Sequence, residues 1–261
     1  MADFSYNDAQ IAELISEFTD PGTREAIELS LLPEILKDAR YFIDVGANVG
    51  LYTFRASKYL RNAQILAIEA NPYLIPVLTK TVDDLRRNNG GGNHYEITAG
   101  AVSDIPGTMD FYVSRLPTLS SAFSNTPAQK LKVPTVRLDD FYREGVPTVI
   151  KIDIEGAEYR AIRSASRFLQ SRETSFFVEL HGWGDKTLGK YPIHLSWLFF
   201  RNGYAQRKIG THYWFYRAPW YERATSFLRQ CPYLGLKYLV SRHGGGLYAA
   251  VLNWRNRRSR V

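Results

Sequence analysis

Short apolar runs alternate with helix-like segments along most of this chain, and this alternation limits its fold more than any other feature. Residues 41–45 and 148–152 are short and mostly apolar, which is typical of strands buried on both faces of a sheet. The segments between such runs repeat apolar residues at helical spacing. This order predicts an α/β fold with a mostly parallel seven-stranded sheet and helices on both faces. The expected strands are residues 41–45, 65–69, 95–102, 148–152, 175–180, 204–209 and 213–216.

The sequence divides into three parts. Residues 1–40 are expected to form an N-terminal helical segment, residues 41–219 the α/β domain, and residues 220–261 a basic, aromatic C-terminal extension. Inside the domain, residues 105–136 hold two short alternating segments around a loop rich in Ser, Thr and Pro, which predicts an inserted hairpin with a mobile loop. The expected helices are residues 7–18, 23–39, 51–60, 72–87, 157–169 and 195–202.

The net charge of +7 is confined to the extension. Residues 220–261 hold eight basic side chains and one acidic one, so residues 1–219 are neutral overall. A neutral body argues against a nucleic-acid groove across the main domain, and no nucleic-acid partner is expected. The extension has two interpretations. Either it completes the core or a subunit interface of a homo-oligomer, or it anchors the protein peripherally at the inner face of a membrane.

Three further features of the sequence bear on the cellular location of the protein. Cys231 is the single cysteine, which excludes an intramolecular disulfide and a cysteine-based zinc or iron–sulfur site. No window approaches the ~20 apolar residues of a membrane-spanning helix. The N-terminus shows no basic region followed by an apolar run, so no signal peptide is expected. These features favour a cytoplasmic protein.

A glycine loop follows the first predicted strand and reads Asp44-Val45-Gly46-Ala47-Asn48-Val49-Gly50. Gly46 permits a sharp turn, and Gly50 lets the next helix pack closely. The dinucleotide fingerprint needs glycine where Asn48 and Leu51 stand, so this loop is a poor diphosphate cradle. The acidic Asp44 suits a cationic or zwitterionic ligand better than a phosphate.

Glu69 adds a second clue to the ligand. It lies 19 positions beyond Gly50, at the end of the next predicted strand. A carboxylate at this place can accept hydrogen bonds from both hydroxyls of a ribose. A glycine turn after one strand and an acid after the next therefore indicate a nucleoside ligand. Since the diphosphate site is missing, S-adenosylmethionine is the leading candidate.

Several motifs between residues 41 and 181 resemble, in order, those of the FkbM family of S-adenosylmethionine-dependent methyltransferases. The most specific is Lys151-Ile152-Asp153-Ile154-Glu155-Gly156-Ala157-Glu158. One departure is that the family commonly has proline directly after the acid equivalent to Glu69, whereas two residues intervene here. The other matching pieces are the glycine loop, Glu69-Ala70-Asn71-Pro72, Ala101-Val102-Ser103-Asp104 with Gly107, Thr135-Val136-Arg137-Leu138-Asp139-Asp140, and Glu179-Leu180-His181.

The resemblance implies a class I, Rossmann-like methyltransferase fold and a set of binding roles. Asp44 and Gly46, in the loop that includes Asn48 and Gly50, would face the methionine part of the cofactor. Glu69 would hold the ribose. Further implied positions are Val102 and Ser103 beside the adenine, Asp153 where the methyl group meets its acceptor, and the Ser120-Ser121 loop closing over the site.

The residues near the fourth predicted strand suggest the chemistry. Lys151 and Asp153 have strand spacing and project to the same side, so they either neutralise each other or reach the open end of the sheet. Asp153 and His181 are the candidate bases, with Lys151 as an electrostatic partner. Glu155 and Glu158 either contribute to the site or offset the dipole at a helix N-terminus. No metal is expected, although an Asp153/Glu179/His181 metal centre is an alternative.

These features together predict an S-adenosylmethionine-dependent O-methyltransferase. The resemblance implies an acceptor hydroxyl on a sugar, glycoconjugate or polyketide-type molecule. Two alternatives from other classes stay open. A nicotinamide-dependent oxidoreductase would share the sheet but needs the missing glycines, and a non-catalytic membrane-surface or glycan-binding module would use the basic, aromatic extension.

Overall fold

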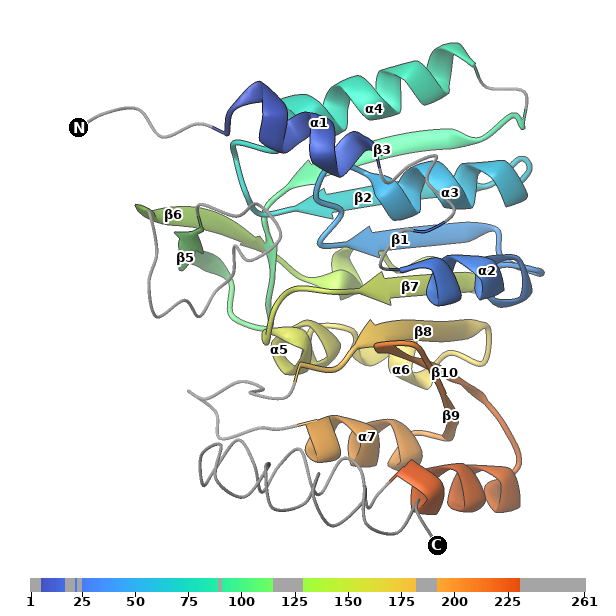
Figure 1. Cartoon of the computed structure of the whole chain (residues 1–261). Coiled ribbons are helices and arrows are strands. Elements are labelled where there is room, and N and C mark those ends of the chain that lie inside the picture. The colour runs from blue at the N-terminus through green and yellow to red at the C-terminus, as the bar shows by residue number, and fades with distance from the viewer. Residues whose placement is uncertain are drawn as a thin grey trace, which may run out of the picture.

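A seven-stranded sheet forms the centre of the protein (Figure 1). The computed structural model describes residues 6–16, 22, 25–88, 91–114, 129–181 and 192–230. The strand order is β3-β2-β1-β7-β8-β10-β9, and β10 runs opposite to its two neighbours. The predicted mostly parallel sheet is therefore confirmed. The strands are β1 (Tyr41–Val45), β2 (Gln64–Glu69), β3 (His94–Ala99), β7 (Thr148–Ile152), β8 (Thr174–Glu179), β9 (Tyr204–Ile209) and β10 (His212–Arg217).

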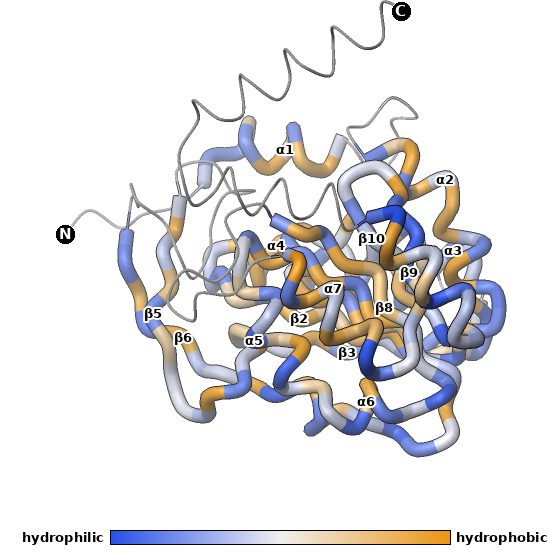
Figure 2. The backbone as a smooth tube through the Cα atoms, turned by 90° about the horizontal axis from the view of Figure 1, so that it is seen from below, coloured by the Kyte–Doolittle hydropathy of each residue, from blue (hydrophilic) through white to orange (hydrophobic). Residues whose placement is uncertain are grey.

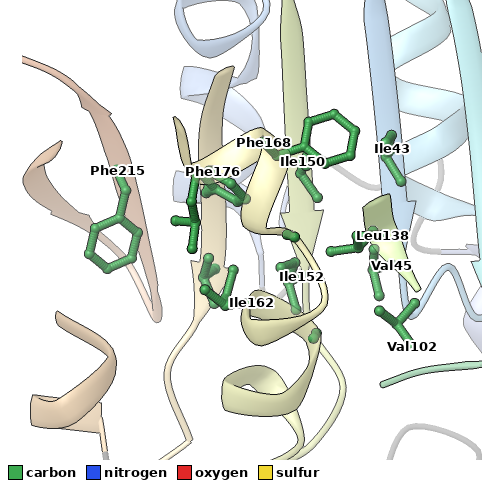
Figure 3. Packing of buried hydrophobic residues seen from close by; sticks show 14 of the residues in the cluster. Ile43, Val45, Val102, Leu138, Ile150, Ile152, Ile162, Phe168, Phe176 and Phe215 are labelled. Carbon is green, nitrogen blue, oxygen red and sulfur yellow. The ribbon is translucent and has the colours of Figure 1, made fainter. Parts of the chain in front are cut away.

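Helices cover both faces of the sheet. On one face, α2 (Ala26–Ile35), α3 (Leu51–Tyr59) and α4 (Ile75–Arg87) pack against residues such as Phe42 and Ile65. On the other, α5 (Glu158–Arg163), α6 (Ser166–Gln170) and α7 (Pro192–Arg201) cover the apolar cluster of Figure 3. Every residue of β1 and β7 is buried as a result, which explains why their sequences are apolar rather than alternating. In Figure 2, where the backbone is coloured by hydropathy, the hydrophobic strands lie inside and the more hydrophilic segments lie outside.

Two predicted elements are each split in the structure. The strand expected over residues 95–102 breaks at Gly100, whose N–H bonds to the carbonyl of Glu69, and β4 (Ala101–Val102) then joins a second sheet. The helix expected over residues 157–169 divides into α5 and α6. The break follows because the carbonyl of Ser164 accepts a hydrogen bond from the N–H of Asp139 instead of continuing the helix.

The second sheet confirms the inserted hairpin. Its order is β4-β6-β5, and β5 (Gly107–Val113) pairs antiparallel with β6 (Gln129–Val136). In Figure 1 this hairpin lies beyond the carboxyl ends of β1, β2 and β7. The Ser120-Ser121 loop lies outside the described residues.

The two ends of the chain add helices. The N-terminal segment contains α1 (Asp8–Ser16) and α2, and α2 ends four residues before its expected end at residue 39. No residue of α1 is fully buried, although Leu14 packs beside Val49 and Leu74. Residues 220–230 form a helix at the start of the C-terminal extension, and residues 231–261 lie outside the described part. Among the helices that the structure describes, none is both long enough and apolar enough to span a membrane.

Candidate active site

A cavity of about 350 Å³ opens at the carboxyl ends of the parallel strands. This is the edge where open α/β sheets bind their ligands, and the volume lies within the usual range of ligand sites, about 300–1,000 Å³. Loops after four strands and residues from the N-terminal segment line it. Its polar and glycine lining residues are Glu25, Gly46, Asn48, Tyr52, Glu69, Gly100, Lys151, Asp153, Glu155, Glu179 and Thr211.

The glycine turn after β1 brings two strand ends together. Gly46 has φ +74°, and a Cβ atom there would lie 1.9 Å from the carbonyl oxygen of Asp153, so the close approach of the two loops requires glycine. Gly50 has φ +95° and faces Leu78 of α4 rather than the cavity. Gly46 and Asn48 therefore line the cavity, whereas Gly50 serves helix packing.

Asp44 lies behind the cavity rather than in its wall. Its side chain is fully buried, and its Oδ2 accepts hydrogen bonds from the backbone N–H (3.0 Å) and the hydroxyl (2.8 Å) of Thr53. The other oxygen lies 3.4 Å from Nζ of Lys151. Asp44 thus ties β1 to the start of α3 and neutralises Lys151, in place of the direct cofactor contact that the resemblance implies.

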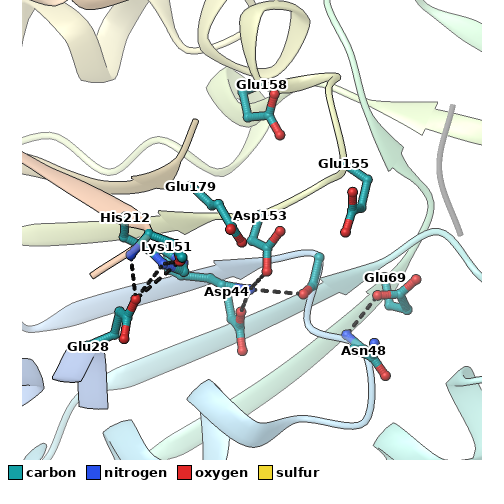
Figure 4. A network of polar contacts seen from close by, with 12 residues as sticks. Glu28, Asp44, Asn48, Glu69, Lys151, Asp153, Glu155, Glu158, Glu179 and His212 are labelled. Carbon is teal, nitrogen blue, oxygen red and sulfur yellow. Dashed lines mark hydrogen bonds and ion pairs between the residues drawn. The ribbon is translucent and has the colours of Figure 1, made fainter. Parts of the chain in front are cut away.

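The carboxylate of Glu69 is held at the cavity wall by backbone groups. Its two oxygens accept hydrogen bonds from the N–H groups of Asn48 and Asn71, each at 2.7 Å, and Figure 4 shows the bond from Asn48. Burial raises the pKa of Glu69, although these two N–H groups oppose the shift. Asn71 is one of the two residues that separate Glu69 from Pro72, so the departure from the family pattern supplies a hydrogen bond to the acid.

The wall next to Glu69 is apolar. Val102 lines the cavity together with Ala101, Met109 and Phe111 from the second sheet. Ser103 is buried outside the lining, where its hydroxyl accepts a hydrogen bond from the N–H of Ile105 at 3.2 Å. Val102, one of the two residues predicted beside the adenine, thus belongs to an apolar part of the cavity wall, whereas Ser103 does not line the cavity.

Lys151 joins the ends of β1 and β7. Its ammonium donates to the carbonyl of Gly46 at 3.0 Å and lies 3.8 Å from Oδ2 of Asp153 (Figure 4). Burial lowers the pKa of Lys151, but the carboxylates of Asp44, Asp153 and Glu25 outweigh it and raise that pKa. Burial conversely raises the pKa of Asp153, and Lys151 and His181 more than offset this effect. The two residues therefore form a pair of opposite charge, with Lys151 buried and Asp153 partly exposed in the cavity wall, as their strand spacing allows.

His181 stands among four carboxylates. Its Nδ1 lies 2.7 Å from Oε1 of Glu158, and its Nε2 faces Glu155 at 3.3 Å, Glu179 at 3.9 Å and Asp153 at 4.0 Å. Burial lowers the pKa of the ring, but Glu158, Asp153 and Glu155 outweigh it and raise the pKa to about 10. The imidazole is thus protonated at neutral pH. A protonated ring cannot accept a proton, so this geometry does not support the base role predicted for His181.

The two glutamates after β7 do not cap α5. The N-cap of α5 is Ala157, with no side-chain capping bond, while Glu158 accepts a hydrogen bond from the N–H of Gly156 at 2.9 Å. Glu155 has φ +53°, a strained conformation for a residue other than glycine, and lines the cavity. Burial raises the pKa of Glu155 to about 7, and His181 opposes the shift. Glu155 therefore lies in the cavity wall, whereas Glu158 lies in the first turn of α5, where a carboxylate also offsets the helix dipole, and contacts His181.

Sequence reasoning missed the residues that reach the cavity from distant parts of the chain. Glu25, at the start of α2, lines the cavity, as does Thr211 between β9 and β10. His212 stacks on Phe177, with ring centroids 4.6 Å apart, and its Nδ1 lies 3.8 Å from Glu28. No local motif marks these residues, because their partners lie far away in sequence.

Asp153, Glu179 and His181 are close enough to share one cation. Within the described ranges, one ligand atom from each lies within 4.8 Å of the other two. A histidine ligand must be neutral, so a metal ion at this place would have to displace a proton from an imidazole whose pKa is about 10.

Residues 44–205, more than half of the chain, match the methyltransferase FkbM domain. The chain belongs to the FkbM methyltransferase family. It is a methyltransferase by family, with the class I, Rossmann-like fold of a mostly parallel seven-stranded sheet. No curated protein is significantly similar to it.

Several solved methyltransferase structures resemble the chain at low sequence identity. The tRNA methyltransferase TrmK of Bacillus subtilis is 9% identical, with a TM-score of 0.47 over 88% of this chain and 83% of that one. A putative caffeoyl-CoA O-methyltransferase from Staphylococcus aureus is 10% identical, with a TM-score of 0.44 over 81% and 100%. Precorrin-6y C5,15-methyltransferase from Geobacter metallireducens is 13% identical, with a TM-score of 0.43 over 76% and 90%.

Proposed function

We propose that this FkbM-family protein transfers a methyl group from S-adenosylmethionine to a hydroxyl oxygen of a sugar, glycoconjugate or polyketide-type acceptor. One observation carries the proposal: a single cavity brings together the Gly46 turn, the fixed carboxylate of Glu69 and the strand-end carboxylate of Asp153. These three groups come from three neighbouring strands of the sheet.

The side of the cavity next to β1 and β2 suits a nucleoside. Glu69 presents a carboxylate whose position is fixed by two backbone N–H groups, beside the apolar wall of Val102, Met109 and Phe111. The side-chain oxygen of Asn48 is buried and accepts no hydrogen bond from the described residues, so it is available to a ligand donor. These groups would hold the adenosine, and the neighbouring carboxylates would offset the positive charges of the methionine part.

The side next to β7 and β8 suits an acceptor that carries hydroxyl groups. Asp153, Glu155 and Glu179 line it, and Glu25 adds a fourth carboxylate. Carboxylates accept hydrogen bonds from hydroxyls and repel anions. Lys151 cannot compensate for an anionic acceptor, because it is 3% exposed and already paired with Asp44. We therefore expect a neutral, hydroxyl-rich acceptor rather than a phosphorylated or carboxylated one.

The protein contributes orientation and a proton acceptor. When bound, S-adenosylmethionine supplies a methyl group on a positively charged sulfur that a hydroxyl oxygen can attack in line. A hydroxyl becomes a good nucleophile as its proton leaves, so a base must lie within ~2.6–3.2 Å of it. We assign this base to a carboxylate, Asp153 or Glu155, since both line the cavity. His181 would hold these carboxylates in place as a cation.

Ligand binding tests the cofactor, and product analysis tests the acceptor. Calorimetry should show binding of S-adenosylmethionine and S-adenosylhomocysteine and no binding of NAD. The bound protein should then label neutral sugars or glycans, and not their phosphorylated forms, from methyl-labelled S-adenosylmethionine. Binding of NAD alone would instead support the oxidoreductase. Cofactor binding with labelling confined to anionic acceptors would retain the methyltransferase and reject the acceptor class.

A further inference from the structure

Exposed large apolar side chains gather at one end of the described structure. Of the eight that are exposed, four lie on α7 or on the helix of residues 220–230, including both exposed tryptophans. Trp220 is 71% exposed, Leu228 66%, Tyr221 59% and Trp197 47%. Single apolar residues scattered over a surface need no explanation, but a group of them marks an interaction site.

Ring contacts link the last described helix to α7, and on that helix the rings of Trp220 and Tyr221 lie side by side, with centroids 6.3 Å apart. The ring of Trp197 stacks on Phe200, with centroids 5.3 Å apart, and Phe227 lies 5.7 Å from Trp197 and 5.2 Å from Phe200. The final described helix therefore packs beside α7, as Figure 1 shows. We call Trp197, Trp220, Tyr221 and Leu228 the aromatic face.

Two polar side chains of the last helix bond to the body of the protein, whereas two of its large apolar side chains are exposed. Ser226 accepts a hydrogen bond from the N–H of Gln206 at 3.1 Å, and Glu222 accepts one from the hydroxyl of Tyr216 at 2.8 Å. Tyr221 and Leu228, seven residues apart, lie on the exposed side. Glu222 is the sole acid among residues 220–261, so the outer side of this helix carries no negative charge.

Positive charge lies on the same helix as most of the aromatic face, where Arg229 is exposed and Arg223 is partly buried. Arg223 and Arg229 belong to the last described helix, and six more basic residues follow within residues 231–261 of the sequence. Because residues 1–219 are neutral overall, the whole net charge of +7 starts at this helix. Two copies of the chain would bring like charges together here, which argues against a dimer through this face.

We propose that the aromatic face docks peripherally on an anionic lipid bilayer. Tryptophan and tyrosine favour the boundary between headgroups and acyl chains, leucine adds apolar burial, and arginines pair with anionic headgroups. The face would bring the protein to a membrane without a spanning helix. This inference does not rest on the proposed function, and its test needs no methyltransferase activity.

Vesicle binding by the full chain tests the proposal. Flotation should show at least about tenfold stronger binding to vesicles with roughly one third phosphatidylglycerol than to phosphatidylcholine alone, and added salt should weaken it. The variant Trp220→Ser/Tyr221→Ser/Leu228→Ser should lose at least about tenfold in this binding. The matched control Tyr59→Ser/Ile105→Ser removes exposed apolar groups elsewhere on the protein and should bind like the wild type.

Three outcomes would overturn the proposal. They are no binding of the wild type to anionic vesicles, equal losses in the control, and a wild-type dimer that the triple variant dissociates without any effect of lipid. Circular dichroism checks that each variant is folded. If the triple variant does not fold, Trp220→Ala changes the most exposed of these side chains and should still reduce binding severalfold.

Discussion

The β1–β2 side and the β7–β8 side of the cavity are built by different means. On the first side, backbone geometry fixes the groups, since Glu69 is held by two N–H groups and Gly46 by its close approach to Asp153. On the second side, side-chain charge fixes the groups. The imidazole of His181 contacts Glu158 through Nδ1, and its Nε2 faces three carboxylates, those of Asp153, Glu155 and Glu179. The contacts of the first side involve one carboxylate, whereas the second side gathers four carboxylates and an imidazole whose mutual interactions depend on their protons. The second side should therefore respond to pH more strongly.

The largest expected effect concerns the charge-fixed side. Asp153→Asn keeps the size of the side chain but removes its charge and its capacity to accept a proton. Turnover should fall by roughly 10²-fold or more, while the dissociation constant of S-adenosylmethionine changes far less. Steady-state kinetics and calorimetry separate the two quantities. Asp110→Asn, which changes an acid on β5 that is not in the cavity lining, is the control and should keep normal turnover.

Full turnover of Asp153→Asn would remove Asp153 as the base. Glu155→Gln is then the deciding variant, because Glu155 lines the same part of the cavity. If both single variants retain full turnover with the authentic acceptor, the base lies outside this carboxylate group.

On the backbone-fixed side, we expect a smaller effect, and it should fall mainly on the affinity for the cofactor rather than on turnover. Glu69→Gln retains the shape but weakens charge-assisted hydrogen bonds to ribose hydroxyls, each about 1.5–3 kcal/mol. Affinity for S-adenosylmethionine should fall at least about tenfold, with turnover at saturating cofactor reduced less. Calorimetry measures the affinity, and Glu96→Gln, an exposed acid on β3, is the matched control. Unchanged affinity in a folded variant would make Glu69 a structural residue.

The smallest expected effect is the pH dependence of the free energy of unfolding, which should come from the charge-fixed side of the cavity. A histidine whose folded pKa is raised from 6.5 to about 10 contributes stability that is complete below pH 6.5 and is lost as the pH rises toward 10. Glu155, with its pKa raised to about 7, reduces stability over a lower range, as the pH rises from about 4.5 to 7. The free energy of unfolding should thus fall by at least about 1 kcal/mol between pH 6.5 and 10.

Glu158→Gln should flatten this upper part of the stability profile. Glu158 is the strongest of the groups that raise the pKa of His181, so its loss should bring the titration of the ring closer to neutrality. Denaturant titration at several pH values measures the stability, and NMR of the His181 ring measures the pKa. A ring that titrates near pH 6.5 in the wild type would contradict the charged cluster.

Much of the fold follows from local sequence. The apolar runs 41–45 and 148–152 match β1 and β7 residue for residue, because strands buried on both faces must be apolar throughout. The splits at Gly100 and Ser164 were not predicted, since each depends on a hydrogen bond to a residue at least 25 positions away. Periodicity reports the environment of a segment and carries no information about such distant partners.

The backbone-fixed side of the cavity was also more predictable than the charge-fixed side. Gly46, Asn48, Glu69 and Val102 line the cavity, as expected from local motifs. The charge on His181 could not be foreseen, because it arises from four carboxylates that only the fold brings together. The role of Glu25 was hidden for the same reason, as its neighbour Lys151 lies more than a hundred residues away in sequence.

The helix α1 gives the cavity an unusual outer wall. It contributes Leu14 to the lining, yet none of its nine residues is fully buried. A helix with so little apolar contact can detach at a small fraction of the global unfolding free energy. Its amide hydrogens should therefore exchange with solvent much faster than those of β1. Entry to the cavity on this side would then be a local opening event, independent of the sheet that holds Asp153 and Glu69.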